Sequence, residues 1–114
     1  MTADEFQAEL HSALRTHFPD VETIIEVRRG VLVEARVYLS DDLFIDVYFH
    51  ALTQKHAYAL IYRQQRQMGY DNYKFWHRHP LEHPHKHEPC EPPTVEAVIA
   101  EMAQAIDILI ARER

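Results

Sequence analysis

Mostly apolar residues recur at α-helical spacing near both ends of the chain. Thr2-Ala-Asp-Glu5 is a capping-box pattern, in which a hydroxyl and a carboxylate three residues later bond backbone amides at a helix start. The helically spaced positions after it are Phe6, Leu10, Ala13, Leu14 and His17, and Pro19 ends the run. Thr94 can cap a second helix, whose apolar stripe contains Val95, Val98, Ile99, Met102, Ile106 and Leu109. We therefore expect a helix before Pro19 and another after Thr94.

Between these helices, apolar and polar positions alternate as they do in strands with one buried face. The alternation is clearest over 43–50. One face of that segment carries Leu43, Ile45, Val47 and Phe49, and the other carries Phe44, Asp46, Tyr48 and His50. Further strands are predicted over 21–28, 31–38, 57–63 and 70–76. The short connections between them favour antiparallel pairing of consecutive strands.

The order of these elements predicts an α+β fold in a single domain over residues 1–114. We expect an antiparallel meander sheet of four to five strands, with the N- and C-terminal helices packed on the face of Ile45, Val47 and Phe49. The other face would expose Asp46, with Tyr58 and Tyr62 nearby on the next strand. Residues 77–93, which are rich in proline, are expected to form an extended loop.

Composition places the chain among globular proteins, with 46% apolar and 26% charged residues. No apolar run approaches the roughly 20 residues that cross a bilayer. The acidic N-terminus lacks a signal-peptide pattern. Cys90 is the only cysteine, which excludes an internal disulfide and a cysteine-rich zinc site. We therefore expect a cytoplasmic protein that does not associate with membranes.

Charge is distributed unevenly. The net charge of −6 argues against nonspecific nucleic-acid binding. However, the segment 54–87 holds six Lys or Arg residues and two acids, and so carries +4, while the rest of the chain carries −10. The same segment holds six of the nine histidines. This asymmetry favours a basic working surface on an acidic body, although scattered solvated charge is the simpler alternative.

The histidine-rich segment allows two kinds of site. Imidazoles suit Zn²⁺ and Ni²⁺, and His83, His85 and His87 are the alternative ligand set for zinc. Folded zinc sites normally draw ligands from separate elements, so a single loop interrupted by proline is a poor metal cage. The first expectation is therefore a site without a cofactor.

Metal-free RNA cleavage needs a base, an acid and a cation at the phosphate. Histidine supplies the first two near neutral pH, and Lys or Arg supplies the third. Aromatic side chains such as Tyr70, Tyr73, Phe75 and Trp76 can stack unpaired bases, although at least one of Tyr73, Phe75 and Trp76 is expected in the core. Asp71 and Asn72 can instead act structurally by capping a turn.

A family resemblance strengthens the RNA interpretation. The aromatic strand AYALIYR (57–63), the Asp71-Asn72 pair and the PHKH sequence (84–87) resemble the TumE-like toxins of toxin–antitoxin modules. The family has an arginine shortly before the Asp-Asn pair, and the nearest arginine here is Arg66. The resemblance implies a growth-inhibiting toxin that acts on RNA and is neutralised by a helix-turn-helix antitoxin.

We therefore expect a metal-independent endoribonuclease that forms a homodimer. The expected catalytic set is His85, His87, His79, His77, Asp46, Tyr58, Arg63 and Lys86. Within this set, His85 and His87 act as base and acid, Arg63 or Lys86 holds the phosphate, and Asp46 or Tyr58 orients a histidine. The expected substrate-binding residues are Asp71, Asn72, Trp76 and Arg78. The histidine-rich segment should fold over the helix-free face of the sheet. The remaining alternatives are a non-enzymatic dimeric interaction protein and a metal-binding protein.

Overall fold

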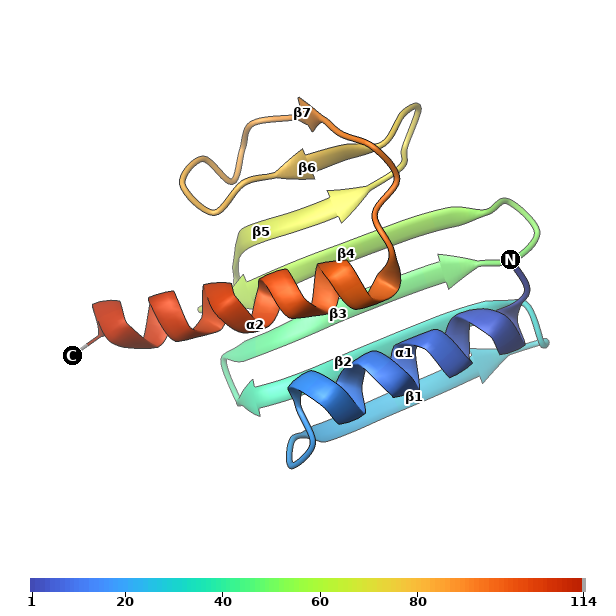
Figure 1. The fold of residues 1–114 in the computed structure, drawn as a ribbon, viewed down its shortest axis with the longest axis horizontal. Helices are drawn as coiled ribbons and strands as arrows, with labels where there is room; N and C mark the ends of the chain where they lie inside the picture. Colours follow the sequence, from blue (N-terminus) through green and yellow to red (C-terminus); the bar gives the residue numbers. More distant parts are fainter. Residues whose placement is uncertain (114) are drawn as a thin grey trace.

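Two helices and seven strands make up the part of the chain that the computed structural model describes, residues 1–113 (Figure 1). The elements are α1 (Ala3–His17), β1 (Glu22–Arg28), β2 (Leu32–Ser40), β3 (Leu43–His50), β4 (Lys55–Tyr62), β5 (Gln65–Asp71), β6 (His77–His79), β7 (Glu88–Pro89) and α2 (Val95–Arg112). The strands follow one another in chain order across one sheet, and every neighbouring pair is antiparallel. The predicted meander and α+β class are confirmed.

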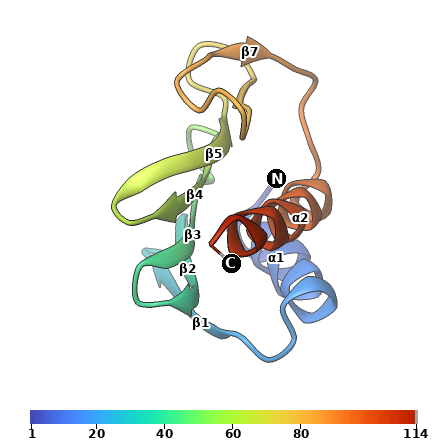
Figure 2. The same ribbon diagram turned by 90° about the vertical axis from the view of Figure 1, so that its left-hand side faces the viewer.

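Both helices begin where their caps predict. The Thr2 hydroxyl accepts a bond from the Glu5 amide, and the Glu5 carboxylate accepts one from the Thr2 amide, so the capping box at α1 is complete. Thr94 accepts from the Ala97 amide at the start of α2. The two helices pack against each other on one side of the sheet and leave its other side uncovered (Figure 2).

The core lies between the helices and the predicted face of β3. Ile45, Val47 and Phe49 are buried there, and the ring of Phe6 from α1 stacks on Phe49 with centroids 4.6 Å apart. Burying an aliphatic or aromatic side chain of this size contributes about 1.5–3 kcal/mol relative to exposing it. This apolar face therefore decides which side of the sheet the helices cover.

The number of strands corrects the sequence prediction of four to five. The fifth strand is Gln65–Asp71 rather than 70–76, and β6 and β7 lie within the segment that was expected to be a loop. The sequence of β5, QRQMGYD, has little apolar alternation. Backbone pairing with β4 instead defines it, with a register shift after Leu60. A strand that is defined mainly by backbone pairing shows little alternation of apolar and polar residues, so the sequence predicts it poorly.

The prediction that Tyr58 and Tyr62 lie on the uncovered face is wrong. Tyr58 is paired with Val47, and side chains of paired residues share a face, so its ring lies on the helix side. Its exposed fraction is 3%, and its centroid is 6.4 Å from that of Phe6. Burial also raises the pKa of the Tyr58 phenol. Tyr62 is paired with core Leu43 and packs against the core.

The uncovered face consists of rows of paired residues that cross several strands. One row joins Asp46, Ala59, Gly69 and His79, and the next joins Tyr48, Ala57, Asp71 and His77. Residues with small side chains therefore occupy the middle of this face, and polar side chains lie on either side of them. Within residues 1–113, neither helix is long and apolar enough to cross a bilayer.

Candidate functional site

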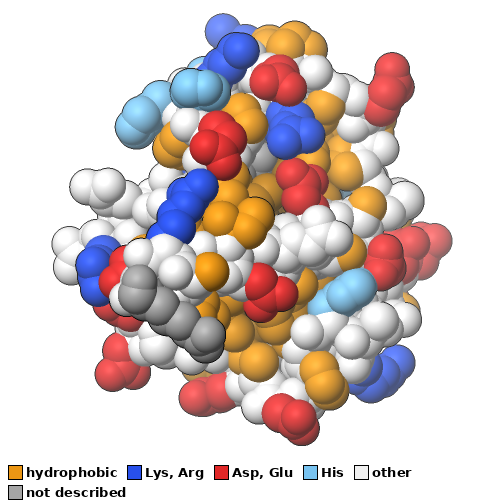
Figure 3. All heavy atoms as spheres, turned by 60° about the vertical axis from the view of Figure 1, so that its left-hand side comes forward, with side chains coloured by type: hydrophobic (Ala, Val, Ile, Leu, Met, Phe, Trp, Pro, Cys, Tyr) orange, Lys and Arg blue, Asp and Glu red, His pale blue; other side chains and the backbone are white. Residues whose placement is uncertain are grey.

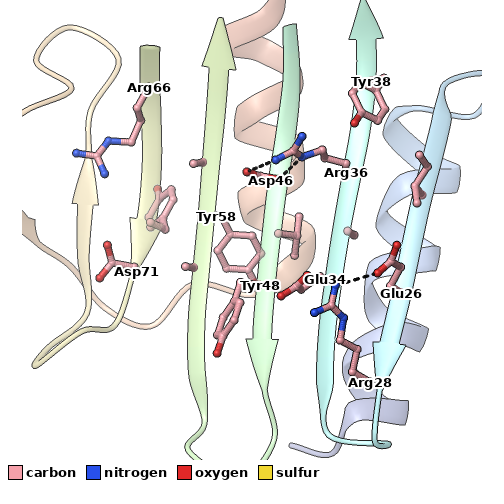
Figure 4. Close-up of a pocket in the computed structure, with 16 residues that line it drawn as sticks. Glu26, Arg28, Glu34, Arg36, Tyr38, Asp46, Tyr48, Tyr58, Arg66 and Asp71 are labelled. Atoms are coloured by element: carbon pink, nitrogen blue, oxygen red, sulfur yellow. Dashed lines mark hydrogen bonds and ion pairs between the residues drawn. The ribbon is translucent and has the colours of Figure 1, made fainter. Parts of the chain in front are cut away.

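The uncovered face of the sheet is hollowed into an open groove of about 600 Å³ (Figure 4). Ala57 and Ala59 of β4 contribute only methyl groups to its lining, which leaves space above the sheet. Arg36 and Asp46 lie on one side of this space, and Arg66 and Asp71 of β5 lie on the other. The groove is therefore polar at both sides and shallow in the middle.

Ion pairs neutralise most of the groove arginines. Arg36 donates to Asp46 with an Nε–Oδ1 distance of 2.8 Å. The Nη2 atom of Arg28 lies 3.2 Å from Oε2 of Glu26 and 3.6 Å from Oε2 of Glu34.

Arg66 differs, because its guanidinium has no carboxylate partner among residues 1–113. Its one hydrogen bond there is a long contact of 3.5 Å to the Pro84 carbonyl. Arg66 is therefore the groove cation that is available to an anionic ligand.

Three histidines meet beside Arg66 at the β5–β6 side of the groove. His77 and His79 of β6 are paired with Asp71 and Gly69 of β5, so all four residues share the uncovered face. The exposed residue His87 approaches them from the following loop, with ring centroids 4.9 Å from His77 and 4.6 Å from His79. One ring nitrogen from each of the three histidines lies within 4.8 Å of the other two. We call His77, His79, His87 and Asp71 the histidine cluster.

Hydrogen bonds fix the orientation of the two buried rings. The Nδ1 atom of His77 lies 3.0 Å from the Phe75 carbonyl oxygen, and that of His79 lies 3.2 Å from the Pro84 carbonyl oxygen. Because a carbonyl oxygen only accepts, each Nδ1 carries the hydrogen. The Nε2 atoms then face Asp71, at 3.2 Å from Oδ2 for His77 and 3.6 Å for His79. The carboxylate of Asp71 is thus the common neighbour of both rings.

Burial affects the protonation of His79. Its exposed fraction is 2%, and its Nε2 atom has no hydrogen-bond partner. Burial lowers the pKa of His79 below its ordinary value, and the positive charge of Arg66 acts in the same direction. Asp71 opposes this shift but is outweighed, so the neutral ring is favoured.

The remaining residues of the histidine-rich loop lie outside the cluster. His83, His85 and Lys86 are exposed. The alternative metal set of His83, His85 and His87 is not assembled in the described part of the chain, because His87 joins the two strand histidines instead. The reason is register: β6 places His77 and His79 opposite β5, and the loop returns only His87 to them.

The expected supporting residues are dispersed. Asp46 lies in the groove but binds Arg36 rather than a histidine. Arg63 lies in the β4–β5 turn, where it contacts Asp42 at 3.8 Å and Glu113 at 3.2 Å. Tyr58 is excluded from the uncovered face, as described above. None of these three therefore contacts the cluster.

Three of the four expected substrate-binding residues have structural contacts instead. Trp76 is partly buried and packs against the core, with its ring centroid 5.3 Å from that of His56. Arg78 lies 3.4 Å from Glu101 of α2, on the helix side. Asn72 accepts from the His56 amide at 2.9 Å and donates to the Gln54 carbonyl at 2.8 Å.

Asp71 makes the turn contact that the sequence allowed and also faces the histidines. Its Oδ1 accepts from the Tyr73 amide at 2.9 Å, which is the expected turn contact, while Oδ2 faces the histidines. Arg66 was absent from the expected set. The family arginine before the Asp-Asn pair was the signal that could have identified it. Histidine and basic side chains lie next to one another at the β5–β7 end of the surface (Figure 3).

Comparisons of this chain with protein-family models, curated proteins and solved structures find no match. The candidate site is therefore defined by its geometry.

Proposed function

We propose that this protein is the toxin of a toxin–antitoxin module and that it cleaves RNA at the histidine cluster. The observation that carries the proposal is the convergence of three imidazoles and one carboxylate beside Arg66, at the side of an open groove. The arrangement supplies the groups that metal-free phosphodiester cleavage needs: a proton acceptor and donor, and a cation for the phosphate. The resemblance of Asp71-Asn72 and PHKH to TumE-like toxins adds support.

His87 is the proposed acid–base residue. It is the member of the cluster that is exposed, so it reaches RNA without movement of the loop. In the proposed reaction, His87 takes the proton of the 2′-hydroxyl, and the 2′-oxygen attacks the phosphorus to form a 2′,3′-cyclic phosphate. The bond to the 5′-oxygen breaks, and the same ring returns the proton to that oxygen. Arg66 balances the charge that develops on the phosphate.

The groove supplies the proposed binding surface for single-stranded RNA. Tyr48 and Tyr38 line it and can stack unpaired bases, each contributing on the order of 1–3 kcal/mol. The excess positive charge of segment 54–87 attracts the phosphate backbone.

The proposed partners follow from the same hypothesis. RNA is the substrate, a helix-turn-helix antitoxin neutralises the toxin, and the protein acts in the cytoplasm, where a lone cysteine such as Cys90 stays reduced. A homodimer also remains a prediction. Within residues 1–113, β1 is the longer of the two edge strands and exposes Ile24 and Val27, so we propose it as the contact strand.

Purified protein tests the proposal most directly. Chelator-treated wild type should cleave single-stranded RNA to 2′,3′-cyclic phosphate products. His87→Ala should lower the rate by about 10²-fold or more, since general acid–base catalysis contributes on the order of 10²–10⁴-fold. Arg66→Ala should also lower the rate.

Two comparison variants sharpen the result. His85→Ala changes an exposed ring two residues away on the same loop, and Arg63→Ala changes an exposed arginine that is already paired with acids. His85→Ala should lower the cleavage rate much less than His87→Ala does. Arg63→Ala should lower it much less than Arg66→Ala does. The proposal is refuted if wild type leaves RNA intact, or if His85→Ala is as damaging as His87→Ala. Inducible expression in bacteria adds a cellular readout: wild type should arrest growth, and His87→Ala should not.

A further inference from the structure

The histidine cluster also has the arrangement of a metal site. We propose that His77, His79 and His87, with Asp71 as the fourth ligand, bind one divalent transition-metal ion of the zinc type. The site differs from the His83–His85–His87 set that the sequence suggested, because two of its histidines lie on a strand. The proposal concerns binding, and binding does not depend on RNA cleavage.

The separations of the ligand atoms fit a tetrahedral ion. With zinc–nitrogen and zinc–oxygen bonds of about 2.0–2.2 Å, neighbouring ligand atoms of a tetrahedral site lie about 3.3–3.6 Å apart. The distances from Asp71 Oδ2 to the Nε2 atoms of His77 and His79, 3.2 Å and 3.6 Å, are close to the two ends of that range. The three histidine ligand atoms already lie within 4.8 Å of one another, so a small inward movement of His87 completes the set.

The hydrogen bonds of the two buried rings match those of metal ligands. A ligating histidine normally donates its other ring N–H to a carbonyl or carboxylate, which fixes the tautomer and the ring direction. His77 and His79 donate from Nδ1 to the carbonyls of Phe75 and Pro84. With hydrogen on Nδ1 alone, each ring has a free Nε2 lone pair, and both Nε2 atoms lie near Asp71 Oδ2.

The cluster contains acceptor atoms that a cation would satisfy. The Nε2 atom of His79 is buried and lacks a hydrogen-bond partner, which is unfavourable for a polar atom. When both rings carry hydrogen on Nδ1 alone, two Nε2 lone pairs face one carboxylate oxygen and repel it, because all three atoms are electron donors. A cation between them removes both problems at once, since it accepts the lone pairs and neutralises Asp71.

The donor set indicates the type of ion. Imidazole nitrogens favour zinc and its neighbours in the transition series, whereas Mg²⁺ and Ca²⁺ prefer oxygen ligands. The ligands come from β5, β6 and the loop that carries His87, so an ion would join that loop to the sheet. This origin from separate segments is typical of folded zinc sites and is absent from the set expected from the loop alone.

A bound ion would also regulate the proposed cleavage, and this consequence rests on the proposed function. The ion occupies the His87 lone pair that accepts the proton of the 2′-hydroxyl. The metal-loaded protein should therefore cleave RNA more slowly than the chelator-treated protein.

Metal titration tests the site. Chelator-treated wild type should bind one equivalent of Zn²⁺ in calorimetry, and Co²⁺ should give the visible absorption of a four-coordinate ion. Mg²⁺ should not compete. Asp71→Asn keeps the turn to Tyr73 but removes the charge, and His87→Ala removes an exposed ligand. Each should weaken Zn²⁺ binding by at least about tenfold, because even second-shell changes cost 10–100-fold.

The exposed loop histidines provide the matched comparison. His83→Ala and His85→Ala should keep stoichiometric binding, since neither residue belongs to the cluster. The proposal is overturned if wild type shows no saturable binding, or if binding survives His87→Ala and is lost in His83→Ala or His85→Ala. Weak binding that is lost gradually with each loop histidine would also overturn it, because that pattern marks surface capture.

RNA assays separate the two proposals. Wild type that binds Zn²⁺ but never cleaves RNA would refute the proposed function and leave the metal site intact. Wild type that cleaves RNA but binds no metal would refute the metal site alone. Cleavage that Zn²⁺ does not slow, at a concentration that saturates the site, would refute the regulatory consequence.

Discussion

At the scale of single residues, Gly69 shows how closely the strands around the candidate site approach each other. Gly69 lies between Ala59 of β4 and His79 of β6 in one row of the uncovered face. A Cβ atom at this position would lie 2.5 Å from the Tyr58 carbonyl oxygen, closer than real contacts allow. Because that oxygen belongs to the backbone, a larger residue can be accommodated only if a strand moves.

Gly69→Ala should therefore destabilise the protein by about 1–3 kcal/mol, the usual cost of overpacking a well-packed region. Denaturant unfolding followed by circular dichroism measures the loss. Gly30→Ala is the comparison, because its surroundings are open and it is strained through a φ of 68° alone. That variant should lose only about 1 kcal/mol. Equal losses in the two variants would contradict the close approach at Gly69.

At the scale of elements, α2 connects the core to the strands that carry the site. Seven of its side chains are buried: Val95, Val98, Ile99, Met102, Ala105, Ile106 and Leu109. Its polar side reaches the outer strands through Glu101, which binds the Tyr70 hydroxyl of β5 and lies near Arg78 of β6. The position at which α2 begins therefore affects both the core and β5–β6.

Thr94→Ala removes the side-chain cap of α2 and should cost about 1 kcal/mol of unfolding free energy. Thermal or denaturant unfolding measures the change. Thr16→Ala is the matched control, since the exposed Thr16 hydroxyl bonds back to the Ser12 carbonyl inside α1. Alanine is the better helix former there, so the control should be neutral or slightly stabilising. A neutral Thr94→Ala would argue against the assigned start of α2.

At the scale of the whole molecule, His56 lies where both layers and the outer strands meet. Its ring approaches Phe6 of α1, Phe49 of β3, Tyr58 of β4 and Trp76 before β6, at centroid distances of 4.7–6.4 Å. Burial lowers the pKa of His56, and the N-terminal ammonium group acts in the same direction. The folded protein therefore keeps this ring neutral down to a lower pH than the unfolded chain does.

The sign of the resulting pH dependence follows from linkage. In the unfolded chain His56 takes up a proton near its ordinary pKa of about 6.5, whereas the folded chain takes it up at lower pH. Its contribution to stability is fully present above pH 6.5 and is lost as pH falls from there toward the folded pKa. Denaturant midpoints between pH 7.5 and pH 5 should thus decline more steeply in wild type than in His56→Gln. His11→Gln, at an exposed position of α1, should keep the wild-type slope. If His56→Gln also keeps the wild-type slope, His56 is not the group responsible.

Local patterns in the sequence determined the two helices, the strands up to β4 and the face that the helices cover. The caps at Thr2 and Thr94 and the alternation over 43–50 are each complete within a few neighbouring residues. The sequence predicted Tyr58 on the uncovered face, whereas the pairing of β4 with β3 places it in the core.

Only the tertiary structure decided the composition of the candidate site. Backbone pairing of β5 with β4 and β6 placed Asp71 opposite His77, and the return of the loop selected His87 rather than His85. Such pairing consists of hydrogen bonds between main-chain groups, which nearly all residues have in common. The pattern of side chains therefore says little about which residues are paired. The types of residue needed for the proposed chemistry were visible in the sequence, whereas their spatial grouping depended on strand register.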